Sequence, residues 1–297
     1  MNNMRGKVCV ITGATSGIGR AAALELGRAG ADVFLIGRNL ARAKDVLKRI
    51  RANPDFRRTE FLKCDMSNQR QIREIAESIR GASKCVDVLI NNAGARFESF
   101  QRSADGIEMT FATNHLSHFL LTALLLESLL KAPEARIVNL AAARHWGARS
   151  DFELCLNPET FIRKAALSTS KLANVVFTFE LAARLRGIGI SVNAVHPGSV
   201  ATRAGSNGRL VPWMRHIVSH ALRGGLISSR KGADTLIFLA VSPEVCGVSG
   251  KYFYRRKPLE TSPESQREEV ARRLWELSVR MTQLDDKIGV GWRFFKP

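Results

Sequence analysis

The sequence contains very little tyrosine. Tyr252 and Tyr254 are the only two tyrosines among its 297 residues, and both lie in one predicted strand near the end of the chain. A phenol hydroxyl can serve as a general acid or base when its pKa is lowered by neighbouring groups. This composition excludes such a group everywhere else along the sequence.

Long hydrophobic runs and paired cysteine motifs are also missing. No run approaches the roughly 18 to 20 apolar residues of a membrane-spanning helix, and residues 1–7 lead into a strand-like segment without the apolar core of a signal peptide. The five cysteines are odd in number and scattered, with no CxxC or Cys/His cluster, so no disulfide framework or metal site is predicted. We expect a soluble, cytoplasmic protein.

Acidic residues are few relative to basic ones. The formal net charge is +18 and the isoelectric point is about 10.5. The basic residues are spread along the whole chain, and only short groups such as Arg255-Arg256-Lys257 stand out. Without a basic arm or an aromatic-studded basic segment, we expect no specific nucleic-acid binding. Weak association with an anionic membrane surface stays open.

Short apolar segments alternate with longer segments of helical periodicity. The predicted strands are residues 7–12, 32–36, 59–64, 86–91, 135–141, 190–196 and 250–254. The predicted helices are residues 18–29, 39–52, 69–81, 104–131, 164–187, 231–241 and 263–283. Strands that are apolar on both faces are typical of a buried parallel sheet.

This alternation predicts an α/β fold. We expect a single-domain, Rossmann-type, doubly wound parallel sheet of about seven strands with helices on both faces. The domain spans residues 1–297, and residues 258–297 form a C-terminal helical tail. Ligands of such sheets bind at the carboxyl ends of the strands.

A glycine-rich segment follows the first predicted strand and opens the first helix. Its spacing is GxxxGxG, which permits a tight turn and close approach of a pyrophosphate to free N–H groups at the helix N-terminus. The alternative is a glycine-rich turn without a ligand. The candidate cofactor-binding residues here are Gly13, Thr15, Ser16, Gly17, Ile18 and Gly19.

Further motifs follow at matching strand ends. Asn91-Asn92-Ala93-Gly94 follows the fourth strand, Ser170-Lys171-Leu172-Ala173-Asn174 lies in the fifth helix, and His196-Pro197-Gly198 ends the sixth strand. Together with Ser249–Phe253 and Lys257-Pro258, they resemble the short-chain dehydrogenase/reductase superfamily, and more closely its retinol-dehydrogenase-like branch. The resemblance covers about residues 5 to 280.

The end of the second strand bears on the choice of cofactor. It carries Gly37-Arg38-Asn39, with no acid there to hold ribose hydroxyls, and Arg38 can pair with a 2′-phosphate. We therefore expect NADP(H) to be favoured over NAD(H). The resemblance implies that Asp65 lies beside the adenine and that Val200 and Thr202 lie near the nicotinamide amide. The remaining cofactor-binding candidates are Met66, Asn92, Ala93, Gly94, Lys171, Pro197 and Gly198.

The resemblance also implies four catalytic positions. In the family a tyrosine exchanges a proton with the substrate oxygen, a serine hydrogen-bonds that oxygen, a lysine binds the ribose and lowers the tyrosine pKa, and an asparagine anchors a water. Asn114 and Lys171 match. Ala142 stands at the serine position and Leu167 at the tyrosine position, so both hydroxyls are lost.

Two nearby side chains are tentative substitutes. Ser168 precedes Lys171 by three residues on the same predicted helix, and His145 follows Ala142 by three in a loop expected to rim the substrate pocket. The alternatives are a serine at a helix start or facing solvent, and a surface or packed loop histidine.

Residues 203–230 correspond to the family's substrate-covering loop. An apolar stripe in this segment suggests a lid over a lipophilic substrate, with an ordinary amphipathic helix as the alternative. The stripe comprises Trp213, Met214, Ile217, Val218 and Leu222.

Three functions stay open. The first is an NADP(H)-dependent oxidoreductase of a lipophilic carbonyl, alcohol or activated double bond, working by a non-standard mechanism without the tyrosine. The second is a catalytically silent NADP(H)-binding protein that acts as sensor, scaffold or partner of an active paralogue. The third is a non-redox cyclase, isomerase or hydratase. Family resemblance predicts a homodimer or tetramer through helices 104–131 and 164–187, or a hetero-oligomer with an active paralogue.

Overall fold

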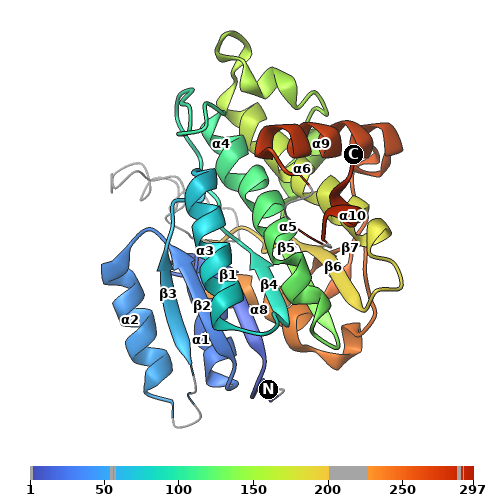
Figure 1. Cartoon of the computed structure of the whole chain (residues 1–297). Coiled ribbons are helices and arrows are strands. Elements are labelled where there is room, and N and C mark those ends of the chain that lie inside the picture. The colour runs from blue at the N-terminus through green and yellow to red at the C-terminus, as the bar shows by residue number, and fades with distance from the viewer. Residues whose placement is uncertain (1–2, 54–55, 57, 201–226, 286–288, 290) are drawn as a thin grey trace.

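Seven parallel strands joined by helices form one sheet in the computed structural model of the chain (Figure 1). The strand order is β3-β2-β1-β4-β5-β6-β7-β8, and β8 alone in this sheet runs antiparallel to its neighbour. The expected single-domain Rossmann-type fold is confirmed. The structure describes residues 3–53, 56, 58–200, 227–285, 289 and 291–297, and of residues 154 and 155 only the backbone.

The strands agree with the predicted segments to within a few residues. They are β1 Val8–Thr12, β2 Asp32–Gly37, β3 Thr59–Lys63, β4 Val88–Asn91, β5 Ala135–Leu140, β6 Ile190–Val195, β7 Lys251–Tyr254 and β8 Lys257–Pro258. The sheet thus gains an eighth, two-residue strand beyond the seven expected. Arg255 and Arg256 form the tight turn between β7 and β8, and both have positive φ angles of 49° and 62°.

The helices begin where side chains can accept their free N–H groups. The Asn39 side chain accepts from Arg42 N at the start of α2, and the Asn68 side chain accepts from Gln71 N at the start of α3. The helices are α1 Gly17–Arg28, α2 Leu40–Arg51, α3 Gln69–Ala82, α4 Met109–Phe111, α5 Ser117–Leu130, α6 Arg163–Arg184, α8 Ser229–Val241, α9 Glu268–Thr282 and α10 Trp292–Phe295.

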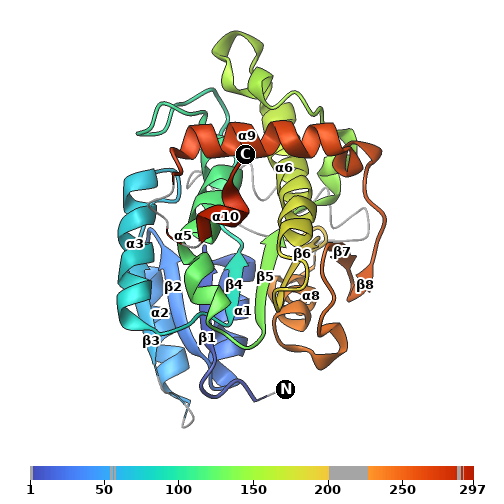
Figure 2. The same cartoon turned by 45° about the vertical axis from the view of Figure 1, so that its right-hand side comes forward.

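Helices cover both faces of the sheet, as expected. One core cluster joins the sheet to α1, α2 and α8. A second cluster joins the opposite face to α3, α5 and α6, and it includes side chains of α9 and α10. Figure 2 shows α9 lying across α5 and α6, with α10 beside them.

The long helix predicted over residues 104–131 is divided into three parts. The Glu108 carboxylate accepts hydrogen bonds from Thr110 N and Phe111 N at 2.7 Å each, so α4 begins only at Met109. Residues Ala112–Leu116 then form a π-helical turn before α5. Such turns insert one extra residue and are frequent at functional sites.

The C-terminal tail is more elaborate than the single helix expected over residues 263–283. A 3-10 turn at Pro263–Gln266 precedes α9, and α10 follows near the end of the chain.

Residues 117–126 of α5 and residues 169–178 of α6 are buried without a break, so neither stretch presents an exposed face. Side chains of α9 and α10 share a core cluster with α5 and α6, the two helices through which a dimer is expected, and the oligomeric state stays a prediction.

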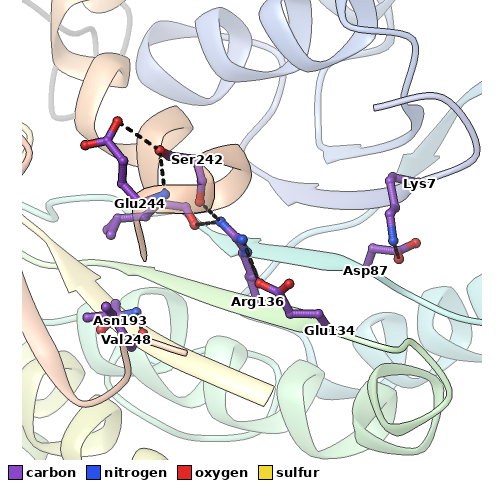
Figure 3. Close-up of polar contacts among 9 residues, drawn as sticks. Lys7, Asp87, Glu134, Arg136, Asn193, Ser242, Glu244 and Val248 are labelled. Atoms are coloured by element: carbon purple, nitrogen blue, oxygen red, sulfur yellow. Dashed lines mark hydrogen bonds and ion pairs between the residues drawn. The ribbon is translucent and has the colours of Figure 1, made fainter. Parts of the chain in front are cut away.

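The amino ends of the strands are held by partly buried polar contacts (Figure 3). Lys7 Nζ lies 2.9 Å from Asp87 Oδ1, and Asp87 Oδ2 accepts from Val8 N. Arg136 pairs with Glu134 and donates to the carbonyl oxygens of Leu239 and Ser242 at the end of α8. These contacts stabilise the sheet at the amino ends of its strands, opposite the carboxyl ends that carry the predicted site.

Candidate functional site

The glycine-rich segment forms a tight turn between β1 and α1. Gly13 and Gly17 have φ angles of +66° and +55°, which disfavour any other residue. A Cβ on Gly13 would lie 2.9 Å from Asn92 Nδ2 and 3.0 Å from Ala93 Cα. A Cβ on Gly19 would collide with the Asn92 amide and the Gly13 carbonyl. The turn is thus packed closely against Asn92 and Ala93.

Thr12 joins this turn to the end of β4. Its hydroxyl accepts hydrogen bonds from Asn92 N and Ala93 N at 2.9 Å each, while Asn92 Nδ2 donates to Thr12 O at 2.8 Å. The side chains of Ile18 and Met66, both predicted as cofactor-binding residues, are buried in the two core clusters. Those two residues can therefore offer a ligand only their backbone.

The N-terminus of α1 fits an anionic group. Ser16 is the N-cap residue, but its side chain makes no capping hydrogen bond, and the first turn contains no acidic residue. The first N–H groups of the helix thus remain available, with the positive end of the helix dipole behind them. Together with the glycine turn, this arrangement has the features of a pyrophosphate site.

Arg38 follows β2 and is exposed, with 67% of its side-chain surface accessible. Its Nη1 lies 3.8 Å from Asp65 Oδ2, while Asp65 Oδ1 accepts from the backbone and hydroxyl of Ser67. Asp65, which was expected beside the adenine, lies two residues after the end of β3, so its carboxylate stands near Arg38 although the end of β2 itself carries no acid. An exposed pair at this distance is weak, so Arg38 stays available to a phosphate.

Asn114 lies within the π-helical turn, and its amide is fully engaged. Oδ1 accepts from Ala95 N at 2.7 Å, and Nδ2 donates to Ala95 O at 3.0 Å and to Ser170 Oγ at 3.1 Å. Ser170 Oγ in turn donates to Leu167 O. The extra residue of the turn thus aims the Asn114 side chain across to the segment after β4 and to α6.

Lys171 extends from α6 to the same place. A Cβ on Gly94 would lie 3.4 Å from Asn114 Oδ1 and 3.8 Å from Lys171 Nζ, so the structure brings these three predicted residues together. Lys171 Nζ donates to Leu140 O at 3.2 Å, and the side chain is 8% exposed. Burial lowers the pKa of Lys171 to about 8, because the ammonium loses hydration.

Ala142 and Leu167 both lie close to this group in the chain. Ala142 follows the end of β5 by two residues and is half-buried. Leu167 lies one turn before Lys171 on α6 and is also half-buried. Ser168 is half-buried on the same helix. Neither Ala142 nor Leu167 can donate a proton.

His145 does not rim an open pocket. Its side chain is buried, with Nδ1 2.8 Å from Ala142 O and Nε2 3.2 Å from Ser262 N. The carbonyl can only accept and the N–H can only donate, so the neutral Nδ1–H tautomer satisfies both nitrogens. Burial also lowers the pKa of His145. This geometry favours the packed loop histidine over a proton donor.

The site is connected to the C-terminal tail by Asn174, His115 and Ser278, to which the sequence motifs assigned no role. Asn174 Nδ2 donates to Asn114 O and to Leu140 O, and Asn174 Oδ1 lies 3.3 Å from His115 Nδ1. His115 Nε2 lies 3.0 Å from Ser278 Oγ in α9. Asn174 belongs to the SKLAN motif, but its distant partners carry no local signal.

The segment after β6 approaches from the other side. Gly198 has a φ of +83°, and His196 stacks on Tyr254 at a centroid distance of 4.9 Å. Val200 pairs with Ile227 in an isolated bridge. Thr202 and residues 203–226 of the predicted lid lie outside the described residues.

A family model described as short chain dehydrogenase matches residues 7–210. The chain belongs to this family. Human retinol dehydrogenase 13 is 39% identical over 296 residues, covering 94% of this chain and 86% of the relative. Mouse retinol dehydrogenase 14 is 38% identical over 285 residues, covering 93% and 85%. These relatives place the short-chain dehydrogenase in the retinol-dehydrogenase-like branch.

Solved structures agree with this assignment. A structure of an uncharacterised protein from Mycobacterium paratuberculosis has a TM-score of 0.75 and 28% identity, and the match covers 96% of each chain. A protein described as an NAD(P)-dependent gluconate 5-dehydrogenase from Beutenbergia cavernae, with bound NADP, has a TM-score of 0.66 and 27% identity, covering 84% and 95%.

The described residues contain neither a membrane-spanning helix nor a cluster of metal ligands. None of the helices is both long and apolar enough to span a bilayer. No group of three or more histidine, cysteine, aspartate or glutamate side chains is placed to hold a metal ion in this part of the chain.

Proposed function

We propose that this short-chain dehydrogenase is an oxidoreductase that binds NADP(H) in preference to NAD(H) and acts on a lipophilic aldehyde or alcohol. The observation that carries the proposal is the grouping of the family's functional side chains at the strand ends. The glycine turn, Asn114 and Lys171 stand together at the strand ends, although Ala142 and Leu167 carry no hydroxyl.

The residues present fit a nicotinamide dinucleotide. The N-terminus of α1 would hold the pyrophosphate, Arg38 would pair with a 2′-phosphate, and Lys171 Nζ would donate to ribose hydroxyls. When bound, the nicotinamide supplies or accepts a hydride. The resemblance to retinol dehydrogenases, which are named for a lipophilic alcohol, indicates the class of substrate.

Leu167 cannot supply the proton that a tyrosine at its position would supply. The Asn114 amide is fully engaged, Ser170 Oγ donates to Leu167 O, and both His145 nitrogens are bonded to backbone. The Lys171 ammonium has three N–H donors, of which one is directed to Leu140 O. We assign the proton to Lys171 Nζ, delivered directly or through a bound water.

The cofactor preference is tested by replacing Arg38. Arg38→Ala should weaken NADPH binding by about tenfold to a hundredfold, since a charge-assisted hydrogen bond is worth about 1.5–3 kcal/mol. NADH binding should not change. Fluorescence titration of both nucleotides measures this, with exposed Arg42→Ala on α2 as the control. Tighter NADH than NADPH binding by the wild type would refute the preference.

The absence of both hydroxyls favours a second candidate, a catalytically silent NADP(H)-binding protein. A retinaldehyde reduction assay separates the two. Reduction by the wild-type chain, lost in Lys171→Met, supports the oxidoreductase. If the wild type is inactive over a panel of aldehydes while the double variant Ala142→Ser, Leu167→Tyr gains NADPH-dependent reduction, the silent protein is the better description.

A further inference from the structure

Two exposed apolar side chains from distant parts of the chain lie close together. Trp146 and Leu259 have 54% and 50% of their surfaces accessible. Scattered apolar residues are common on protein surfaces, and the similarly exposed Leu40 of α2 is one of them. Trp146 and Leu259 differ from it because two buried rings connect the segments that carry them.

His145 and Tyr252 provide this connection. Their ring centroids lie 4.9 Å apart in an edge-on contact, and the centroid of the Trp146 ring is 5.8 Å from that of His145. Leu259 N donates to Tyr252 O at 2.7 Å, which extends the antiparallel register of β7 and β8 by one pair. Opposite residues in such a pair point to the same face of a sheet. Leu259 therefore lies on the face where Tyr252 meets His145, the buried neighbour of Trp146.

Basic side chains flank these two residues. Arg144 is exposed in the same 3-10 turn as Trp146, and Lys257 is exposed two residues before Leu259, on the same face of the hairpin. Arg255 is exposed in the turn between β7 and β8. None of these three cations forms an ion pair with a carboxylate in the part of the chain that the structure describes. We call these five residues the edge patch: Arg144, Trp146, Arg255, Lys257 and Leu259.

Acidic residues are rare in the two segments that form the edge patch. Residues 140–150 contain none, and residues 250–260 contain only Glu260. The edge patch thus combines exposed apolar surface with an excess of positive charge.

The edge patch adjoins the candidate site. Arg255 follows the carboxyl end of β7, and the carboxyl ends of the parallel strands carry the site. His145 Nδ1 lies 2.8 Å from Ala142 O, which holds the turn of Trp146 beside the position that lacks the serine. β8 is the last strand of the sheet, and Figure 2 shows it at the opposite edge from α2. A surface that contacts the edge patch therefore lies next to the site.

We propose that the edge patch docks on an anionic lipid surface, with Trp146 and Leu259 inserted among the headgroups and the cations facing lipid phosphates. Tryptophan is favoured at such an interface because its ring is apolar and its N–H is polar. The net charge of +18 draws the whole chain toward an anionic surface, and the cations of the patch add to this attraction. A fluid lipid surface needs only a few inserting side chains, whereas a stable protein interface buries about 800 Å² on each partner.

Docking in this orientation brings the strand ends close to the lipid. Lipophilic aldehydes and alcohols dissolve in a bilayer, so the substrate would reach the site from the membrane rather than from water. This consequence rests on the proposed function, whereas the docking itself does not.

Co-sedimentation with vesicles tests the docking on the full chain without cofactor. The vesicles are phosphatidylcholine alone, or phosphatidylcholine with about one-third phosphatidylglycerol. We expect binding to the anionic vesicles only, and weaker binding as salt is added. The double variant Trp146→Ser, Leu259→Ser should lower the partition coefficient by roughly tenfold or more. Arg255→Gln with Lys257→Gln should lower it by about tenfold to thirtyfold, since each cation contributes about a factor of five.

The matched control lies on α2 at the other edge of the sheet. Leu40→Ser with Lys44→Gln also removes one exposed apolar residue and one exposed cation, and it should change the partition coefficient by less than about twofold. Brominated lipid chains should quench tryptophan fluorescence of the wild type but not of Trp146→Phe. The proposal is overturned by absent binding to anionic vesicles, by an equal loss in the α2 variant, or by quenching that persists in Trp146→Phe.

A separate assay distinguishes this inference from the proposed function. NADPH-dependent reduction of a short, water-soluble aldehyde without vesicles reports on the oxidoreductase alone. Patch-dependent vesicle binding by a chain without this activity supports the docking and counts against the proposed function. Reductase activity in a chain that does not bind anionic vesicles overturns the docking alone.

Discussion

The Lys171 ammonium loses most of its contact with water when the chain folds. A base whose pKa is lower in the folded state, here about 8, binds fewer protons there than in the unfolded chain, where a lysine has a pKa of about 10.4. By linkage, the free energy of unfolding rises with pH wherever the unfolded state binds more protons than the folded state. The penalty is therefore complete below about pH 8 and disappears as the pH rises toward 10.4.

Replacing Lys171 should thus stabilise the chain at neutral pH. We expect Lys171→Met to raise the free energy of unfolding at pH 7 by on the order of 2–3 kcal/mol. Leu140 O keeps its hydrogen bond from Asn174, so the substitution strands no acceptor. Denaturant titrations at pH 7 and pH 10 measure the difference, which should shrink at the higher pH. An advantage equal at both values would contradict the assigned cause.

His145 shows what a sequence leaves undetermined at this scale. Its position three residues after Ala142 suggested a proton donor, but its second partner, Ser262 N, comes from a segment 117 residues away. Lys171 and Asn114, in contrast, could be predicted because each belongs to a motif at a strand end or on the following helix. Local patterns identify such residues, whereas the state of a side chain depends on partners that only the fold supplies.

A structural role for His145 has a measurable signature. His145→Ala leaves the Ala142 carbonyl and the Ser262 N–H without their partner, so the free energy of unfolding should fall by about 1–3 kcal/mol. The pH profile of any reductase activity should keep its shape. A profile that loses a titration near the ordinary histidine pKa in this variant would restore His145 as a proton carrier.

Among the elements, the division of the predicted helix 104–131 is the clearest departure from the sequence pattern. Helical periodicity of 3.6 residues cannot reveal a single inserted residue, and the segment is apolar on all sides, so the pattern stays continuous through the π-helical turn. The sequence pattern also did not predict the capping role of Glu108, because its partners, Thr110 N and Phe111 N, belong to the backbone.

At the amino end of β5, away from the candidate site, Arg136 connects this strand to the end of α8. Its guanidinium is about nine-tenths buried and satisfies carbonyl oxygens of Leu239 and Ser242 that the helix itself leaves free. Arg136→Met should therefore lower the free energy of unfolding by about 2–4 kcal/mol. Exposed Arg144→Met is the control and should change it by less than about 0.5 kcal/mol in the same denaturant titration.

For the whole molecule, the C-terminal tail completes the core. Trp275 of α9 packs on Phe119 and Phe295, its Nε1 donates to Phe295 O, and the Arg184 guanidinium lies 4.0 Å from its ring centroid. The sequence pattern predicted α9, but it could not show which surface α9 covers. An amphipathic stripe indicates that one helix face is buried, not which element it packs against.

Removing the Trp275 ring should open this core. Trp275→Ala is expected to lower the free energy of unfolding by about 3–5 kcal/mol, as for other buried aromatics. Trp146, with 54% of its surface exposed, provides the matched control, and Trp146→Ala should have little effect. Equal losses in the two variants, measured by thermal or denaturant unfolding, would show that α9 contributes little to the core.

Because the tail packs over α5 and α6, the core between them can be completed only late in synthesis. Phe119 and Phe177 are made long before Trp275 and Phe295, which close over them. At about 5–20 residues per second, the ribosome leaves this apolar surface open for many seconds. A nascent chain must therefore be shielded by a chaperone, or risk aggregation, until Trp275 and Phe295 have emerged.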